Sequence, residues 1–138
     1  RMRAKLLGCL LWPICVSGFA HGLLPSRLES ESGGRFVAYR FTAINYYNTS
    51  DRYEVECFKG TDFKITWPCK AIPNQFNLLP HAKRSFKVQI ETQGDGIYLV
   101  CTKEVASDDQ EIITRVCAKW GVGVSVATPG VPTANVHK

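Results

Sequence analysis

The side chains with the clearest chemistry in this 138-residue sequence are cysteines. Four remain once the apolar amino-terminal segment is set aside: Cys57, Cys69, Cys101 and Cys117. An even number in a small exported domain favours disulfides over metal binding, although four cysteines permit three connectivities. No pair has the spacing of a zinc knuckle, and no histidine stands beside a cysteine. We predict local pairing, Cys57 with Cys69 and Cys101 with Cys117, and no metal site.

Residues of the kinds that catalyse reactions are present but scattered. Ser85 lies in an alternating apolar and polar segment without flanking glycines, and His81 lies in a turn. Asp108, Asp109 and Glu111 form a small acidic cluster that is typical of a solvated loop. No nucleophile stands beside a base, and no Cys-x-x-Cys motif occurs. The sequence therefore predicts a protein that is not an enzyme, with no cofactor and no small-molecule substrate.

Residues 1–20 have the pattern of a secretory signal peptide. Arg1, Arg3 and Lys5 precede the apolar run "LLGCLLWPICV", which is short for a membrane span, and small residues precede a cut after Ala20. Removing this segment takes three of the 17 basic residues and none of the 12 acidic ones, which leaves 14 against 12, a net charge of +2. We expect export to an oxidising compartment, and the small charge gives no support for nucleic-acid binding.

Short segments of period-two alternation, separated by turn residues, fill the region from residue 35 to 126. "SFKVQIE" places Phe86, Val88 and Ile90 on one face, and no segment has a helical period. About seven short strands predict an all-β fold for residues 21–127, an antiparallel β-sandwich of immunoglobulin-like type, with a small β-barrel as the alternative. Residues 128–138, rich in proline and without an apolar pattern, are expected to be a linker or tail with no second domain.

Three motifs occur in a specific order along this predicted domain. Pro25-Ser26-Arg27 precedes a glycine at Gly33, "IPNQFNLLPHAKRSFKVQI" spans residues 72–90, and Cys117-Ala118-Lys119 lies on the last strand. In order and spacing they resemble the N-terminal immunoglobulin-like domain of periplasmic pilus (fimbrial) chaperones, the PapD-like family. The resemblance covers residues 23–129.

The resemblance implies a periplasmic chaperone in pilus assembly, with pilin subunits and an outer-membrane usher as partners. In this family the chaperone's last strand completes an unfinished pilin, which is donor-strand complementation, and the partner's backbone is paired while apolar side chains fill its groove. By motif position, Arg27 and Lys119 are expected to hold the pilin's terminal carboxylate. The expected donor strand holds Ile112, Ile113, Thr114, Val116 and Ala118.

The donor row departs from the family's pattern, because Arg115 and Cys117 interrupt it. The cleaner apolar row, Trp120, Val122, Val124 and Val126, follows Lys119 and is expected to complete this domain's own sheet. One alternative is a secreted immunoglobulin-like structural or adhesive module similar to a pilus subunit, but "HGLLPSRLESESGG" is a poor match to a pilin's donor extension. Another is a small disulfide-linked enzyme inhibitor with a rigid loop over Gly60–Cys69.

Overall fold

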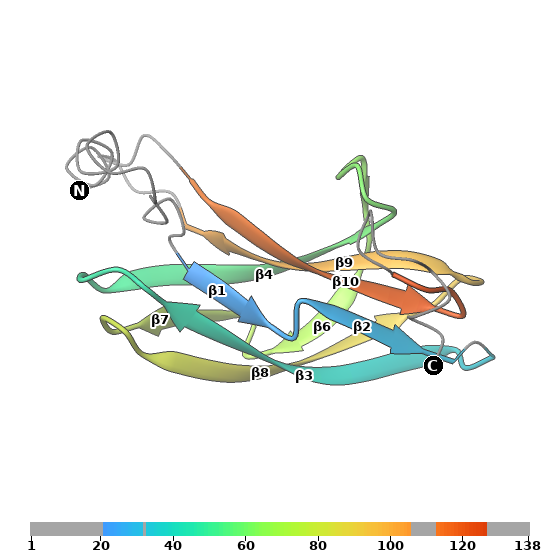
Figure 1. Ribbon diagram of the computed structural model, residues 1–138, viewed down its shortest axis with the longest axis horizontal. Helices are drawn as coiled ribbons and strands as arrows, with labels where there is room; N and C mark the ends of the chain where they lie inside the picture. Colours follow the sequence, from blue (N-terminus) through green and yellow to red (C-terminus); the bar gives the residue numbers. More distant parts are fainter. Residues whose placement is uncertain (1–20, 32, 106–112, 127–138) are drawn as a thin grey trace.

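The protein consists of two β-sheets packed face to face, as Figure 1 shows. The computed structural model describes residues 21–31, 33–105 and 113–126. These ranges hold no helix, and so none that is long and apolar enough to cross a membrane. The strands are β1 (His21–Leu24), β2 (Arg27–Ser30), β3 (Phe36–Asn45), β4 (Asp51–Lys59), β5 (Ile65–Thr66), β6 (Cys69–Ile72), β7 (Gln75–Leu78), β8 (Lys83–Glu91), β9 (Gly96–Glu104) and β10 (Arg115–Val122).

This architecture confirms the predicted all-β, immunoglobulin-like sandwich, with more and shorter strands than the expected seven or so. The four-stranded sheet has the order β1-β3-β8-β6. The six-stranded sheet has the order β2-β10-β9-β4-β5, and β7 also pairs with β4. The expected signal peptide, the tail after residue 127 and Ile112 lie outside the described residues.

The first extended segment of the chain contributes to both sheets. β1 pairs antiparallel with β3, and after Pro25 and Ser26 the chain continues as β2, which pairs with β10. The pairing of β2 with β10 is parallel, whereas every other strand pair is antiparallel. Because the chain passes from one sheet to the other between β1 and β2, only Lys119–Val122 of β10 pairs with this segment.

The core lies between the sheets and follows the alternation in the sequence. In β8, Phe86, Val88 and Ile90 have no exposed surface, while Lys87 between them is exposed. Trp120 of β10 is fully buried and packs against the ring of Phe41 at a centroid distance of 5.7 Å. Burying each such side chain stabilises the fold by roughly 1.5–3 kcal/mol.

The apolar row after Lys119 belongs to this core, as expected for a row that completes the domain's own sheet. Trp120, Val122 and Val126 are buried, and Val124 is partly exposed. Trp120, Val122 and Val126 therefore offer no surface to a partner, whereas Val124 is 39% exposed.

Two disulfides reinforce the sandwich, with the local pairing that the sequence predicts. Cys57–Cys69 links β4 of the six-stranded sheet to β6 of the four-stranded sheet. Cys101–Cys117 joins directly opposite residues of β9 and β10, with their Cα atoms 4.0 Å apart. In the loop-entropy account each link is worth about 3 kcal/mol.

Candidate functional site: the open edge of β10

Two basic side chains stand side by side where β2 begins. Lys119 of β10 is in register with Arg27 of β2, and the backbone N–H of Lys119 donates to the carbonyl oxygen of Ser26 at 3.0 Å. Their neighbours Leu28 and Trp120 pack into the core. Because side chains alternate along a strand, Arg27 and Lys119 both point to the outer face of the six-stranded sheet.

These two cations have no counter-charge in the part of the chain that the structure describes. Neither side chain makes an ion pair or a hydrogen bond within residues 21–31, 33–105 and 113–126. Like charges on directly opposite positions of neighbouring strands destabilise a sheet. An anion bound between them removes that repulsion, and a carboxylate accepts strong, charge-assisted hydrogen bonds from both groups.

The backbone of β10 is open on the same side, just before Lys119. β2 pairs only with Lys119–Val122, and β1, the strand before β2, pairs with β3 instead. Since the N–H of Lys119 points towards β2, the peptide groups of Arg115 and Cys117 point the same way. Among the described strands, none pairs with β10 at Arg115–Ala118 on this side.

The direction of β2 determines what an added strand places beside the two cations. A strand that occupies this open edge lies in line with β2, which runs parallel to β10. If it also runs parallel to β10, it ends at Arg27 and Lys119, and its C-terminal carboxylate meets both. The opposite direction brings an amino terminus to the same place, which the two cations repel. In this geometry the carboxylate of a parallel strand and the two cations carry opposite charges.

The expected donor residues do not share one environment. Ala118 has no exposed surface and belongs to the domain's own core. Val116 is partly buried against that core, and the Thr114 hydroxyl lies 3.3 Å from the Nδ1 atom of His21. Ile113 is 43% exposed. The donor role stays a prediction for Ile113, Thr114 and Val116, whereas the burial of Ala118 leaves it no surface for a partner.

A second, small apolar cluster on the outer face holds the start of β10 in place. It consists of Phe58 of β4, Leu99 and Cys101 of β9, with Cys117 packed against it. The Arg115 guanidinium lies 5.4 Å from the centre of the Phe58 ring. The sequence signal for this cluster is the unbroken run "YLVC", because a strand that is apolar on both faces is covered on both.

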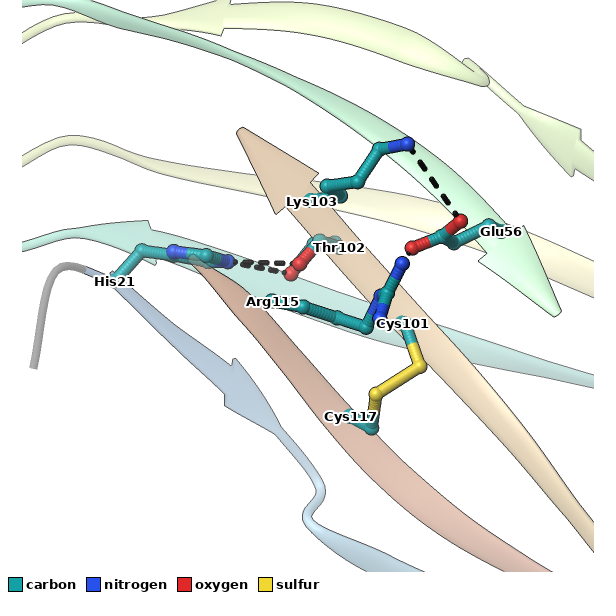
Figure 2. The surroundings of a disulfide bond; sticks show 7 residues. All are labelled: His21, Glu56, Cys101, Thr102, Lys103, Arg115 and Cys117. Atoms are coloured by element: carbon teal, nitrogen blue, oxygen red, sulfur yellow. Dashed lines mark hydrogen bonds and ion pairs between the residues drawn. A yellow bond between two sulfur atoms is a disulfide. The ribbon is translucent and has the colours of Figure 1, made fainter. Parts of the chain in front are cut away.

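Arg115, which in the sequence only interrupts the donor row, is held by several contacts. Figure 2 shows its side chain beside the Cys101–Cys117 bond, donating from Nε to Glu56, to which Lys103 is also directed at 3.8 Å. The guanidinium also lies 5.1 Å from the ring of Phe63, a residue in the left-handed backbone region with φ of 63°. These contacts already order the Arg115 side chain in the free protein. Binding of a strand beside it therefore costs less conformational entropy.

A buried polar cluster lies beneath the start of β10. His21 is 1% exposed, and its Nε2 atom lies 2.9 Å from the Thr102 hydroxyl. The His21 ring is tilted by 43° against the ring of Tyr53, with 4.6 Å between the centroids. Burial lowers the pKa of His21, against the opposing effects of the Thr102 backbone hydrogen bond and of the Asp51 charge. Burial, and then the charge of Asp51, raise the pKa of Glu104. No group of three or more potential metal ligands is found in the described ranges.

The raised pKa of Glu104 predicts a pH-dependent effect of Glu104→Gln. A carboxyl whose pKa is raised by folding stabilises the protein below its unfolded pKa, and this contribution is lost as the pH rises through the folded pKa. The variant stays neutral, so its free energy of unfolding relative to wild type is expected to increase as the pH rises above about 4, the unfolded pKa of a glutamate. Urea titrations at several pH values measure it, with Glu91→Gln, an exposed carboxylate, as control. A difference that does not vary with pH contradicts this prediction.

Comparisons with known proteins support the fold. No protein-family model matches the chain, and no curated protein matches it in sequence. Among solved structures, the E. coli chaperone DraB gives a TM-score of 0.59 at 18% identity, over 75% of this chain and 54% of DraB. A structure of the Salmonella enterica SafA pilin in complex with the SafB chaperone gives 0.59 at 15% identity, over 80% of this chain and 57% of the matched chain.

The fold also occurs outside pilus systems. WR4, a C. elegans MSP family member, gives a TM-score of 0.54 at 6% identity, over 75% of this chain and 97% of WR4. This chain spans about half the length of the matched chains in the two bacterial structures. At these identities the likeness establishes the fold, which is the one found in periplasmic fimbrial chaperones, as the sequence motifs predict.

Proposed function

We propose that this chain is the subunit-binding domain of a periplasmic chaperone for pilus assembly, and that it binds pilin subunits by donor-strand complementation. The observation that carries the proposal is the pairing of Arg27 with Lys119 at the end of an open strand edge. Support comes from the shared fold, because the neighbours include a structure of a pilin with its chaperone and one of a chaperone with a tip adhesin.

In the proposed complex, the pilin's last strand runs parallel to β10 along Arg115–Ala118, and its carboxylate lies between the two cations. The backbone hydrogen bonds give affinity without dependence on sequence, and the carboxylate sets the register. In the other direction, Ile113, which is 43% exposed, offers apolar surface to the pilin's groove. The donor role that the sequence predicts for Ile112 concerns a residue outside the described ranges. We expect the complex to form in the periplasm and to be delivered to an outer-membrane usher.

The alternative of a pilus subunit has less support from the structure. A pilin needs an amino-terminal extension that can be donated to its neighbour. Here the segment His21–Ser30 is already paired in both sheets, Leu23 is buried and Leu28 packs against the core. This segment therefore belongs to the domain itself.

The proposal is tested with peptides that copy the last strand of a pilin encoded beside this gene. One peptide ends in a free carboxylate and the other in an amide. We expect the free acid to bind more tightly by about 1.5–3 kcal/mol, or about tenfold to a hundredfold, because it accepts charge-assisted hydrogen bonds. Isothermal titration calorimetry measures both. Equal affinities contradict the carboxylate site, and the absence of binding by either peptide contradicts pilin as the partner.

A further inference from the structure

The outer face of the four-stranded sheet, on the opposite side of the molecule from Arg27 and Lys119, is strongly basic. We call it the basic face and define it by four exposed side chains: Arg40 of β3, Lys83 and Lys87 of β8, and Lys70 of β6. Their strand neighbours Phe41, Phe86 and Val88 are buried, so the alternation directs these cations outwards. Arg40 and Lys87 are directly opposite each other in the β3–β8 pairing.

No carboxylate neutralises this face in the part of the chain that the structure describes. Glu91, at the far end of β8, is the only acidic residue in β1, β3, β6 and β8, and it pairs with Arg35 at 3.0 Å. None of the four cations makes an ion pair or side-chain hydrogen bond with a described residue. By contrast, Lys103 and Arg115 on the six-stranded sheet are paired with glutamates. The opposed pair Arg40 and Lys87 therefore repel each other without compensation.

Exposed apolar side chains surround the cations on the same face. Ile72 of β6 is 60% exposed and directly opposite Lys87, and Leu24 of β1 is 54% exposed. The ring of Tyr46, also half exposed, covers Gly22, where an added Cβ atom would lie 2.9 Å from it. Phe36, the first residue of β3, is similarly exposed. Basic and apolar side chains are thus mixed over one sheet surface.

We propose that the basic face binds the surface of an anionic membrane. The cations are spread over three strands, about 10 Å across, and Lys83 and Lys87 are about 13 Å apart along β8. A single anion needs donors that converge on one point, whereas a bilayer offers many phosphates in a plane. Lys and Arg near such a surface are attracted to anionic headgroups, and apolar and tyrosine side chains enter the interface between them.

The basic face and the open edge of β10 lie on different sheets. In Figure 1, β3 and β8 run along the lower side of the sandwich, while β9 and β10 belong to the other layer. Arg27 and Lys119 point away from the four-stranded sheet, since their neighbours Leu28 and Trp120 point towards it. The protein can therefore bind a membrane surface and a partner strand at the same time. A substitution on one face is expected to remove one binding activity and leave the other.

The test is co-sedimentation of the purified protein with vesicles made of equal parts phosphatidylcholine and phosphatidylglycerol, and with vesicles of phosphatidylcholine alone. We expect binding only to the anionic vesicles, and a decrease as salt is added. The double variant Arg40→Gln/Lys87→Gln is expected to bind about 25-fold more weakly, since each cation contributes about fivefold. The control Arg52→Gln/Lys64→Gln removes the same charge from β4 and from the loop that precedes β5, outside the basic face, and is expected to bind as wild type does.

Two further variants separate this proposal from its alternatives. Ile72→Ser is expected to weaken vesicle binding without changing its salt dependence, because it removes only apolar surface. Arg27→Glu is expected to leave vesicle binding unchanged, so a failure of the pilin proposal does not affect this one. Equal losses in the two double variants contradict the basic face as the site. The proposal is also wrong if anionic vesicles are not bound while polyglutamate is, because the face then recognises an acidic polypeptide.

Discussion

Arg27→Glu is expected to abolish binding of the partner subunit, with a loss of about 2–5 kcal/mol in binding free energy. The change removes one of the two cations, and it also places a carboxylate directly opposite Lys119 in the β2–β10 pairing. An internal ion pair then occupies the remaining cation, and the partner's carboxylate meets a negative charge instead of two positive ones. Co-expression with the candidate pilin, followed by purification and titration, measures the effect.

The matched control is Arg40→Glu, which reverses the charge of an exposed arginine on the other sheet. This variant is expected to retain the pilin and to lose affinity for anionic vesicles. Arg27 is exposed, and the change replaces two opposed cations by an ion pair, so Arg27→Glu is expected to unfold at a urea concentration no lower than that of wild type. If Arg27→Glu retains a pilin as well as wild type does, the carboxylate site is wrong even where the fold is intact.

Trp120→Ala is expected to have the largest effect on stability, a decrease of about 3–5 kcal/mol in the free energy of unfolding. Trp120 has no exposed surface, and its ring lies near those of Phe41 and Tyr39. Its Nε1–H donates to the Ser30 hydroxyl at 2.8 Å, so the side chain also joins β10 to β2. The total stability of a domain of this kind is about 5–15 kcal/mol, so the variant is expected to be close to unfolding.

Two controls divide this effect into its parts. Ser30→Ala leaves the Trp120 Nε1–H without this acceptor while the ring stays in place, and is expected to cost about 1–3 kcal/mol. Tyr39→Ala truncates a neighbouring ring that is 45% exposed, and is expected to cost less than Trp120→Ala. Urea denaturation of the three variants compares them. A cost for Trp120→Ala no greater than that for Tyr39→Ala contradicts the central place of Trp120 in the core.

The sandwich was predictable because the alternation is local. Residues two apart share a face of a strand, so Phe86, Val88 and Ile90 mark the core without knowledge of their neighbours. The pairing of Cys101 with Cys117 followed for a similar reason, because β9 and β10 are consecutive strands of one sheet. Cys57 and Cys69 lie in different sheets, and only their nearness in the sequence indicated their pairing. The division of the first segment into β1 and β2 was not predictable, because it depends on which distant strands, β3 and β10, are available to pair.

The arrangement of the candidate site shows the same limit. The motifs indicated Arg27 and Lys119 separately, but their direct register depends on a parallel pairing that no short-range pattern specifies. The basic face was not predictable from the sequence for a related reason. "SFKVQIE" shows that Lys87 points outwards, yet only the sheet order brings Arg40 to one side of it and Ile72 to the other.

The parallel pairing of β2 with β10 also determines when the partner site comes into existence. β2 is near the beginning of the folded domain and β10 is its last strand. Contacts between such distant segments form late in folding, because a long loop must close before they contribute. A chain that is still being synthesised has Arg27 before it has Lys119. The two cations therefore come together only after the sandwich is closed, so an incompletely folded chain does not present this site.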